Sequence, residues 1–262
     1  MGTDRLAQAV RQQLGLGRVL PLGGPADGAW ITERAARGVL RRAADALPGV
    51  RLGPLRIGAS GSGASGPEAA ERAAVPPPPS ALPPGPLSVE ARFAASADQP
   101  LPTTAGLLRD ALRATAVDRL GLAVDTVDLH ITSLFDDEAA AAAEADDDRG
   151  SEDPGTPTDA PSGARTETAA VEDAVRGVPG VTRLAPALGG PAAHAVRVED
   201  RTAEGAAAAG RHVQVQLAVG ADHRALDVAL AVREAVAGAA SAGAGGPVTV
   251  AVLITAVDGG EG

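Results

Sequence analysis

Apolar residues recur at helical spacing in two stretches of the chain, and each stretch leads into a similar four-residue motif. The first stretch consists of Ile31, Ala35, Val39, Ala43 and Leu47. The second contains Ala170, Ala174 and Val178, with Val171 and Val175 beside them. Leu47-Pro48-Gly49-Val50 and Val178-Pro179-Gly180-Val181 follow. Spacing by four predicts a helix with one buried face, and Pro-Gly ends it because Pro cannot continue a helix and Gly tolerates the turn.

A strand-like segment follows each motif, over 50–57 and 181–188, and a stretch of alternating residues comes later. The alternating apolar positions are Leu87, Val89, Ala91 and Phe93 in the first half, and Val213, Val215, Leu217 and Val219 in the second. Alternation with a period of two predicts half-buried strands.

A second helix and a closing strand complete each half. The helices are expected over 106–120 and 222–240, and the strands over 126–134 and 248–257. Arg109-Asp110 aligns with Arg233-Glu234, and Ile131-Thr132 with Ile254-Thr255. The order helix, strand, strand, helix, strand thus occurs twice, with an extra strand expected over 194–199. We therefore predict an α+β fold made of two tandem copies of a small two-layer domain, each a largely antiparallel sheet covered on one face by helices.

Composition divides the chain into segments. We predict an N-terminal basic segment over 1–29, a first domain over 30–135, an acidic linker over 136–165 and a second domain over 166–258. The linker has ten acidic and two basic residues, so it carries most of the net charge of −10. High charge with low hydrophobicity predicts disorder there. Residues 59–86 are rich in Gly, Ser and then Pro, which predicts a surface insertion in the first domain.

Three arginines in the first helix recur at helical spacing: Arg34, Arg37 and Arg41. The ordinary interpretation of such a basic stripe is a solvated helix face. The functional alternative is contact with an acidic partner, namely anionic lipid, nucleic acid or the acidic linker of the same chain. In the last case the linker would be autoinhibitory, and its deletion would strengthen binding to acidic surfaces.

Composition and motifs favour a protein that is not an enzyme. Cysteine is absent, which excludes disulfides and thiolate chemistry, and the only aromatic residues are Trp30, Phe93 and Phe135. Gly61–Gly66 fits G-x-G-x-x-G, but the proline run that soon follows leaves no room for the required helix. His194, His212 and His223 lack the spacing of a metal site, although His194 and His212 would lie on adjacent strands and Asp222 neighbours His223. We assign no catalytic, cofactor-binding or metal-binding residue.

The residues Ile31-Thr32-Glu33-Arg34-Ala35, the helix after them and Leu47-Pro48-Gly49-Val50 resemble the opening of the alkaline shock protein (envelope stress response) family. The second half, from Val178 to Asp258, resembles the family over a longer stretch. Nearly the whole chain is also similar to actinobacterial proteins labelled as a nucleopolyhedrovirus P-ten family, a label without physical content here. The tandem copy, the Pro-rich insertion and the acidic linker depart from the family pattern.

The resemblance implies a non-catalytic scaffold that self-associates or binds related family members. It also implies a place in the cytoplasm, peripheral to the inner face of the membrane through a membrane-anchored protein, and a link to envelope stress. No cofactor and no small-molecule substrate are expected. Nucleic-acid binding through the Arg34, Arg37 and Arg41 face is the alternative, which the absence of Lys and of an aromatic stacking platform disfavours.

The N-terminus lacks the apolar run of a signal peptide, and the uncharged stretch over 235–257 reaches membrane-spanning length. Because Gly243 to Pro247 interrupt that stretch, we expect a helix end, a turn and a strand instead of a membrane span.

Overall fold

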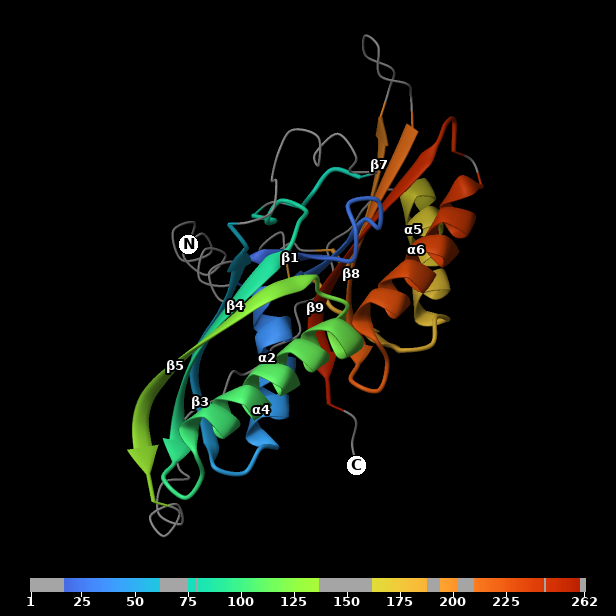
Figure 1. Ribbon diagram of the computed structural model, residues 1–262. Helices are drawn as coiled ribbons and strands as arrows, with labels where there is room; N and C mark the ends of the chain where they lie inside the picture. Colours follow the sequence, from blue (N-terminus) through green and yellow to red (C-terminus); the bar gives the residue numbers. More distant parts are fainter. Residues whose placement is uncertain are drawn as a thin grey trace, which may run out of the picture.

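The computed structural model describes residues 17–61, 75–78, 80–136, 162–187, 194–201, 210–242 and 244–259. The fold is mixed α+β, with two sheets and four α-helices among these residues (Figure 1). In chain order the elements are β1 (Val19–Leu22), β2 (Ala29–Thr32), α2 (Glu33–Asp45), β3 (Val50–Ala59), β4 (Leu87–Ser96), α4 (Leu101–Ala114), the π-helix η1 (Thr115–Leu120), β5 (Val124–Phe135), α5 (Ser162–Arg176), β6 (Val181–Leu184), β7 (Val196–Arg201), β8 (Gly210–Gly220), α6 (Ala225–Ser241) and β9 (Val248–Asp258).

The smaller sheet has the strand order β3-β4-β5. Strand β3 runs antiparallel to β4, and β5 runs parallel to β4. The parallel pair arises because α4 and η1 carry the chain back across the sheet before β5 begins, a crossover that two parallel strands require. The expectation of a largely antiparallel sheet is therefore met only in part: the smaller sheet has one antiparallel and one parallel pairing, and the larger sheet has three antiparallel and two parallel pairings among the described strands.

The larger sheet has the order β1-β2-β9-β8, with β6 and β7 also paired to β8. Strands β8 and β9 are parallel and are connected by α6, whereas β6 and β7 are antiparallel to β8. Helices α5 and α6 lie together on one side of this sheet (Figure 1). The pairing of β8 with its neighbours thus repeats the pairing of β4 with β3 and β5.

Strand β7 lies where the extra strand of the second half was expected, but it is not an addition to the pattern. Strand β6 pairs with residues 217–219 of β8, and β7 pairs with residues 210–215. In the first half, the single strand β3 spans the corresponding length of β4, with a register shift between Leu52 and Leu55. Strands β6 and β7 together therefore occupy the position along β8 that β3 occupies along β4.

The two parallel pairs share an irregularity. The register of β4 with β5 shifts between Phe93 and Ala94, and the register of β8 with β9 shifts between Leu217 and Ala218. At the first shift the hydroxyl of Thr132 donates to the Phe93 carbonyl at 3.1 Å, and at the second the hydroxyl of Thr255 donates to the Leu217 carbonyl at 3.3 Å. The aligned Ile-Thr dipeptides of the sequence therefore occupy matching positions in the two sheets.

The Pro-Gly motifs also occupy matching positions. Gly49 and Gly180 both have positive φ, of 72° and 89°. The Gly49 carbonyl accepts the Ser96 amide at 2.8 Å, and the Gly180 carbonyl accepts the Gly220 amide at 2.9 Å. In both halves the motif thus ends a helix, as predicted, and connects the following strand to the end of its partner strand.

The hairpin of β1 and β2 was not predicted and joins the two halves. The segment expected to be N-terminal and basic, 1–29, contains β1 and the first residue of β2. Strand β2 runs parallel to β9, so the first half of the chain supplies two strands at one edge of the larger sheet. Ile31, expected on the first helix, lies in β2, and Thr32 caps α2 by accepting the Ala35 amide at 3.3 Å.

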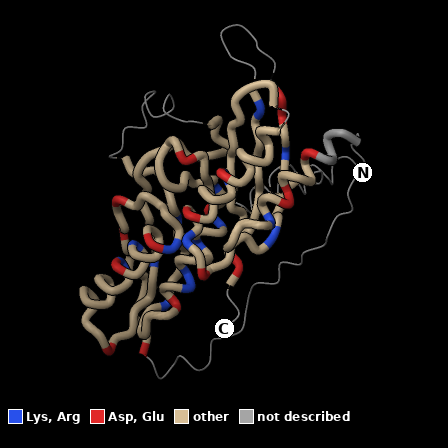
Figure 2. Tube along the Cα trace, turned by 90° about the vertical axis from the view of Figure 1, so that its right-hand side faces the viewer, with Lys and Arg blue, Asp and Glu red and all other residues tan. Residues whose placement is uncertain are grey.

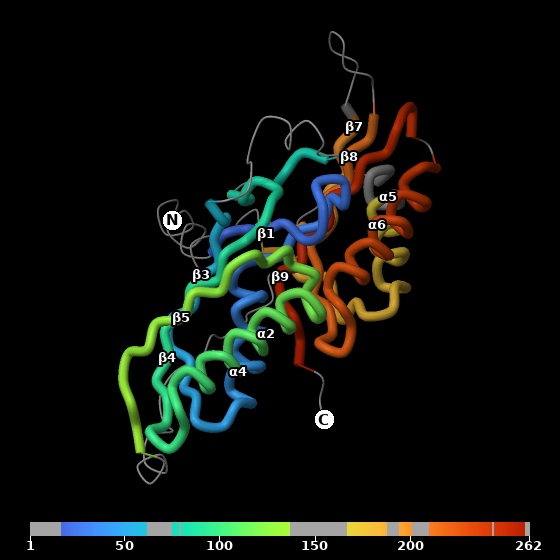
Figure 3. The backbone as a smooth tube through the Cα atoms, in the orientation of Figure 1, coloured from blue at the N-terminus to red at the C-terminus, as the bar shows by residue number. Residues whose placement is uncertain are grey.

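Helix α2 lies between the two sheets and packs against both β3 and β9 (Figures 1 and 3). Its buried residues are Ala35, Ala36, Val39, Leu40 and Ala44. They belong to one continuous cluster of buried apolar side chains that draws on both sheets and on α2, α4, α5 and α6. The described parts of the two halves thus share a core.

A smaller cluster covers the other face of the larger sheet. Trp30 of β2 packs there with Val19, Ala251 and Leu253, beneath Val75. Val75, within the Pro-rich insertion, therefore packs on this face of the sheet. The rest of that insertion over 62–74, and the expected linker over 137–161, lie outside the described residues. Helix α5 begins at Ser162, so the last four residues of the expected linker are helical.

The uncharged stretch over 235–257 divides as expected: α6 ends at Ser241 and β9 begins at Val248. Among the described residues, no helix is both long enough and apolar enough to cross a membrane.

Candidate functional site

The basic stripe of α2 lies along the free edge of β3. Arg41 donates to the Gly53 carbonyl at 3.4 Å, and Glu33 accepts the Ile57 amide at 3.2 Å. Arg37, between them on the helix, is half-buried, and its Nε is buried without a hydrogen-bond partner among the described atoms. Only Arg34 of the three arginines is both exposed and without a described hydrogen bond. The predicted interaction face is therefore in part a structural cover that protects the edge of β3.

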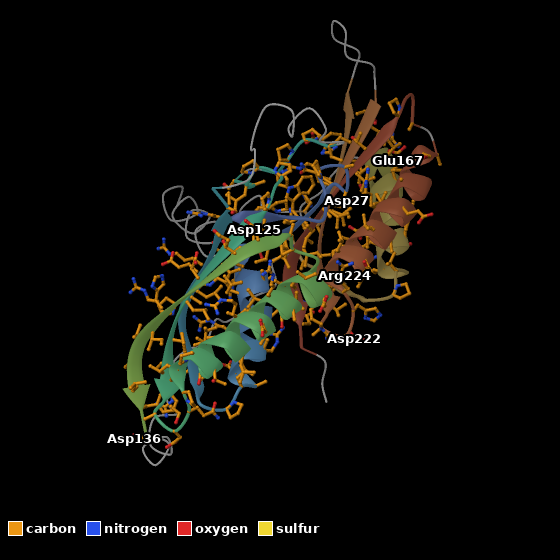
Figure 4. The ribbon with its side chains drawn as sticks, in the orientation of Figure 1. Asp27, Asp125, Asp136, Glu167, Asp222 and Arg224 are labelled. Atoms are coloured by element: carbon orange, nitrogen blue, oxygen red, sulfur yellow. The ribbon has the colours of Figure 1, made fainter. Side chains whose placement is uncertain are left out.

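The opposite edge of the smaller sheet is β5, and α4 covers only its beginning. Arg113 donates to the Asp125 carbonyl at 3.1 Å, and Arg109 donates to the Val127 carbonyl at 3.3 Å. Asp125 and Asp136 mark the two ends of this strand in Figure 4. No described strand pairs with the outer edge of β5, and no described side chain donates to a β5 carbonyl beyond Val127. Among the described residues, the second half of β5, from Leu129 to Phe135, is thus an open edge.

Exposed apolar side chains accompany this open edge. Ile131 and Leu134 of β5 are 43% and 56% exposed, and Leu107 of α4 is 52% exposed. Phe135 is held differently, because the guanidinium of Arg51 lies 3.9 Å from the centre of its ring. Of the four large apolar residues that are exposed in the described part of the chain, only Val117 lies on neither β5 nor α4.

The corresponding edge of the larger sheet is covered. Strand β9 takes the place of β5, and its outer edge is paired with β2. Arg233 of α6, which aligns with Arg109 in the sequence, donates to the Ala26 and Asp27 carbonyls at 2.8 and 3.1 Å and so holds the turn before β2. Arg109 instead donates to the Val127 carbonyl near the start of β5. Corresponding arginines therefore hold an added strand in the larger sheet and cover the first part of the edge strand in the smaller one.

Two arginines connect the halves of the chain beside the start of α6. Arg119 of η1 donates to the Ala221 carbonyl, and Arg224 donates from Nε to the Val117 carbonyl of η1 at 3.3 Å. Asp222 and Arg224 lie near η1 at this end of α6 (Figure 4). Six-residue π-helical segments such as η1 are rare and occur frequently at functional sites.

A groove of about 350 Å³ opens at this junction. It is lined by Val39, Arg42, Ala43, Thr115, Arg119, Leu120, Ala221, His223 and Val257. These residues come from α2, η1, the turn after β8 and the end of β9, so neither half of the chain forms the groove alone. Thr115 is the only hydroxyl residue in the lining, and the lining holds no carboxylate.

The histidines do not converge. Glu199 of β7, not His194, lies opposite His212 on β8, so the expected approach of His194 and His212 is wrong. The ring of His212 is buried, with its Nδ1 2.9 Å from the Thr249 hydroxyl. His223 pairs with Asp222 at 3.0 Å, and His130 lies 3.8 Å from Glu90 on the sheet surface. The described residues contain no group of three side chains placed to hold a metal ion.

The comparisons with known proteins return no match. No family model, no curated protein and no solved structure is similar to this chain at a significant level.

One buried charge has a structural explanation. Arg211 of β8 donates to both carboxylate oxygens of Asp200 on β7, at 2.7 and 3.1 Å, and to the Ala240 carbonyl at 3.2 Å. Glu167 of α5 approaches it to 3.5 Å. The hydrogen bond from Arg211 lowers the pKa of Asp200, and the positive charge acts in the same direction while burial opposes it. This cluster ties together β7, β8, α5 and α6.

Sequence reasoning missed Arg42, Arg119 and Arg224. Arg42 adjoins Arg41 in the sequence, but most of the groove lining, from Thr115 to Val257, lies far along the chain. Basic and acidic positions are interspersed over the described trace, so no local run of charge marks the groove (Figure 2). The only local indication of this site is that a helix ends at Gly121, and this indicates nothing about the residues that the second half of the chain contributes.

Proposed function

We propose that the chain is a tandem repeat of one α+β unit and acts as a non-catalytic interaction protein that self-associates through the open edge of β5. The observation that carries the proposal is the contrast between two corresponding edges. The edge of β9 is covered by β2, and the edge of β5 has no strand beyond it among the described residues.

The repeat is supported by features that simple packing does not require. Three features occur at corresponding places in the two sheets. They are the register shifts of the parallel pairs, the hydroxyl bonds of Thr132 and Thr255, and the carbonyl bonds of Gly49 and Gly180. Because the larger sheet uses the outer edge of its last strand to bind another strand, the same use is expected of β5. The acidic linker between the two units remains part of this proposal.

A second copy of the chain is the occupant that the edge favours. An unpaired strand offers a row of amide and carbonyl groups to another strand, and exposed apolar side chains strengthen that tendency. The open residues 129–135 are self-complementary, since two such edges pair antiparallel about a two-fold axis. Ile131 and Leu134 would then be removed from water in both copies.

A cytoplasmic place near the membrane, held by a membrane-anchored protein, and a link to envelope stress belong to the proposal through the resemblance to the alkaline shock protein family. A non-catalytic role is supported by the site chemistry: the His223 and Asp222 pair is exposed, and the lining of its groove contains no Ser or Cys nucleophile.

Hydrogen exchange on the full-length protein tests the proposed edge pairing. Amides of residues 129–135 should exchange more slowly at high than at low protein concentration, because dimer formation gives them new hydrogen-bond partners. Amides of β3, whose edge α2 already covers, serve as the internal control and should not change. Exchange in residues 129–135 that is independent of concentration would contradict the proposal.

A further inference from the structure

The groove between the halves presents two guanidinium groups to one space. Arg42 reaches it from α2, and Arg119 reaches it from η1. Each bonds to the backbone at the same end of the larger sheet: Arg42 donates to the Val257 carbonyl at 3.5 Å and Arg119 donates to the Ala221 carbonyl. The Ala221 amide in turn donates to the Asp258 carbonyl at 2.9 Å, so the two anchoring points are neighbours.

Neither guanidinium has a carboxylate within salt-bridge distance among the described residues, in contrast to Arg176, Arg183, Arg211 and Arg224. An Arg side chain carries five N–H donors, and the backbone bonds of Arg42 and Arg119 use only part of them. The remaining donors belong to side chains that line the groove. Among the described residues, the groove therefore contains two positive charges that no carboxylate pairs with directly.

A carboxylate at the turn after β8 feels the charge of Arg119 as a minor influence. Asp222 has a lowered pKa, chiefly because it pairs with His223, with further contributions from its own backbone amide and from the charge of Arg119. Its side chain is 71% exposed and lies outside the lining. Asp222 thus holds the ring of His223 at the rim without occupying the space between Arg42 and Arg119.

The rest of the lining restricts the ligand. Thr115 offers a hydroxyl, and His223 offers a ring nitrogen. Val39, Ala43, Leu120 and Val257 form an apolar wall. A volume of about 350 Å³ lies at the lower end of the range for small-molecule sites. Guanidinium groups match phosphate oxygens in geometry and charge.

We propose that this groove binds a phosphoryl group attached to a compact apolar body, with Arg42 and Arg119 on the phosphate oxygens and Val39, Leu120 and Val257 against the apolar part. The ligand is either a soluble phosphomonoester or the headgroup of an anionic phospholipid. Because residues of both halves line the groove, a bound ligand stabilises the contact between the two halves.

Two kinds of probe, soluble phosphates and lipid vesicles, distinguish these sources in experiments on the full-length protein. Phenyl phosphate and inorganic phosphate are titrated into the labelled protein, with binding followed by NMR shifts. Binding to phosphatidylcholine vesicles is measured with and without phosphatidic acid. Phenyl phosphate should bind more tightly than inorganic phosphate, because only the former contacts the apolar wall.

The substitutions Arg42→Gln and Arg119→Gln should each weaken phenyl phosphate binding by about tenfold or more, as expected for loss of a charged hydrogen-bond donor. Arg41→Gln is the matched control, because Arg41 neighbours Arg42 in sequence but points to Gly53. It should change the affinity less than twofold. Arg42→Lys, which keeps the charge, should recover part of the binding, and circular dichroism establishes that each variant is folded.

Vesicle binding that requires both phosphatidic acid and Arg42 supports the groove with a lipid as its source. Phenyl phosphate binding that requires Arg42 and Arg119, without vesicle binding, supports it with a soluble source. No binding of either probe overturns the proposal. An equal loss of binding in the Arg41→Gln and Arg42→Gln variants also overturns it, because surface charge alone then accounts for the effect.

Discussion

Arg224, at the start of α6, donates from Nε to the carbonyl oxygen of Val117 at 3.3 Å, and so binds the second half of the chain to the π-helix of the first. Arg119 forms the reciprocal contact from η1 to the Ala221 carbonyl. Together with the shared core and the β2 to β9 pairing, these bonds make the two halves one packed unit.

Loss of either arginine should therefore weaken the whole fold. Arg119→Ala and Arg224→Ala should each lower the free energy of unfolding by about 1 kcal/mol, the usual net contribution of a hydrogen bond. Arg176→Ala is the control, because Arg176 pairs with Glu172 of the same helix on its solvent-facing side, and its loss should cost no more than about 0.5 kcal/mol. Denaturant unfolding measures all three. Effects of Arg119→Ala and Arg224→Ala no larger than the control would argue against the junction.

Gly121 ends η1 where the halves are in close contact. It has a φ of 85°, and a Cβ there would lie 2.5 Å from the Cβ of Leu226 on α6. Gly121→Ala should destabilise the protein by about 2–4 kcal/mol, through the left-handed backbone and the overlap with Leu226. Gly106→Ala is the matched control, because a Cβ at Gly106 meets no atom within 4 Å and α4 gains helix propensity. It should stabilise by about 0.5–1 kcal/mol. Thermal unfolding of both variants checks the opposite signs.

Thr255 and Thr132 allow one substitution to be compared at two corresponding sites. Thr255 is buried, and its hydroxyl contacts the Ala185 and Leu217 carbonyls at 2.9 and 3.3 Å. Thr255→Val should cost about 1–2 kcal/mol, because buried carbonyls lose a donor. Thr132→Val, at an exposed position, should cost about 0.5 kcal/mol or less. Urea titrations give both values, and an equal cost at the two sites would show that burial does not set the difference.

The sequence was sufficient for the elements with strong periodicity. Alternation at Leu87 to Phe93 and at Val213 to Val219 correctly located β4 and β8, and the Pro-Gly motifs correctly located the ends of α2 and α5. The short strands β1 and β2 were missed because four buried residues have no readable period, and their partner β9 lies more than 200 residues away in the chain. The parallel pairings of β4 with β5 and of β8 with β9 could have been predicted, because in each pair a helix separates the two strands in the sequence.

The candidate surfaces were harder to predict. Arg34, Arg37 and Arg41 were found by their spacing, but the sequence does not reveal that Arg41 covers the edge of β3. Whether an edge is open depends on which distant strand pairs with it, so the contrast between β5 and β9 becomes visible only in three dimensions. The groove at Arg42 and Arg119 also requires the packing of both halves.

The Asp200 and Arg211 pair predicts a dependence of stability on pH. Because the folded-state pKa of Asp200 is lowered, its pairing contributes stability above the unfolded-state pKa, about 3.9, and loses it as the pH falls through the lower folded-state pKa. Asp200→Asn should therefore lower the melting temperature at neutral pH, and the difference from the wild type should shrink below about pH 4. Melting curves across this range test it. A difference that stays constant down to the lowest pH would contradict the pairing.

The proposed self-association depends on the apolar side chains at the open edge of β5. Replacing Ile131 and Leu134 by Lys places charge on that edge and should prevent two copies from pairing, because like charges would face each other and the burial of apolar surface is lost. Val117→Lys is the matched control, since Val117 is an exposed apolar residue on η1, away from β5. Both variants should retain the fold of the wild type by circular dichroism.

Sedimentation velocity of these proteins over a wide range of concentration is the most direct test. The wild type and the Val117→Lys variant should form a dimer as concentration rises, and the Ile131→Lys/Leu134→Lys variant should remain a monomer throughout. A wild type that stays monomeric at every concentration, or a dimer that persists in the Ile131→Lys/Leu134→Lys variant, would contradict self-association through β5.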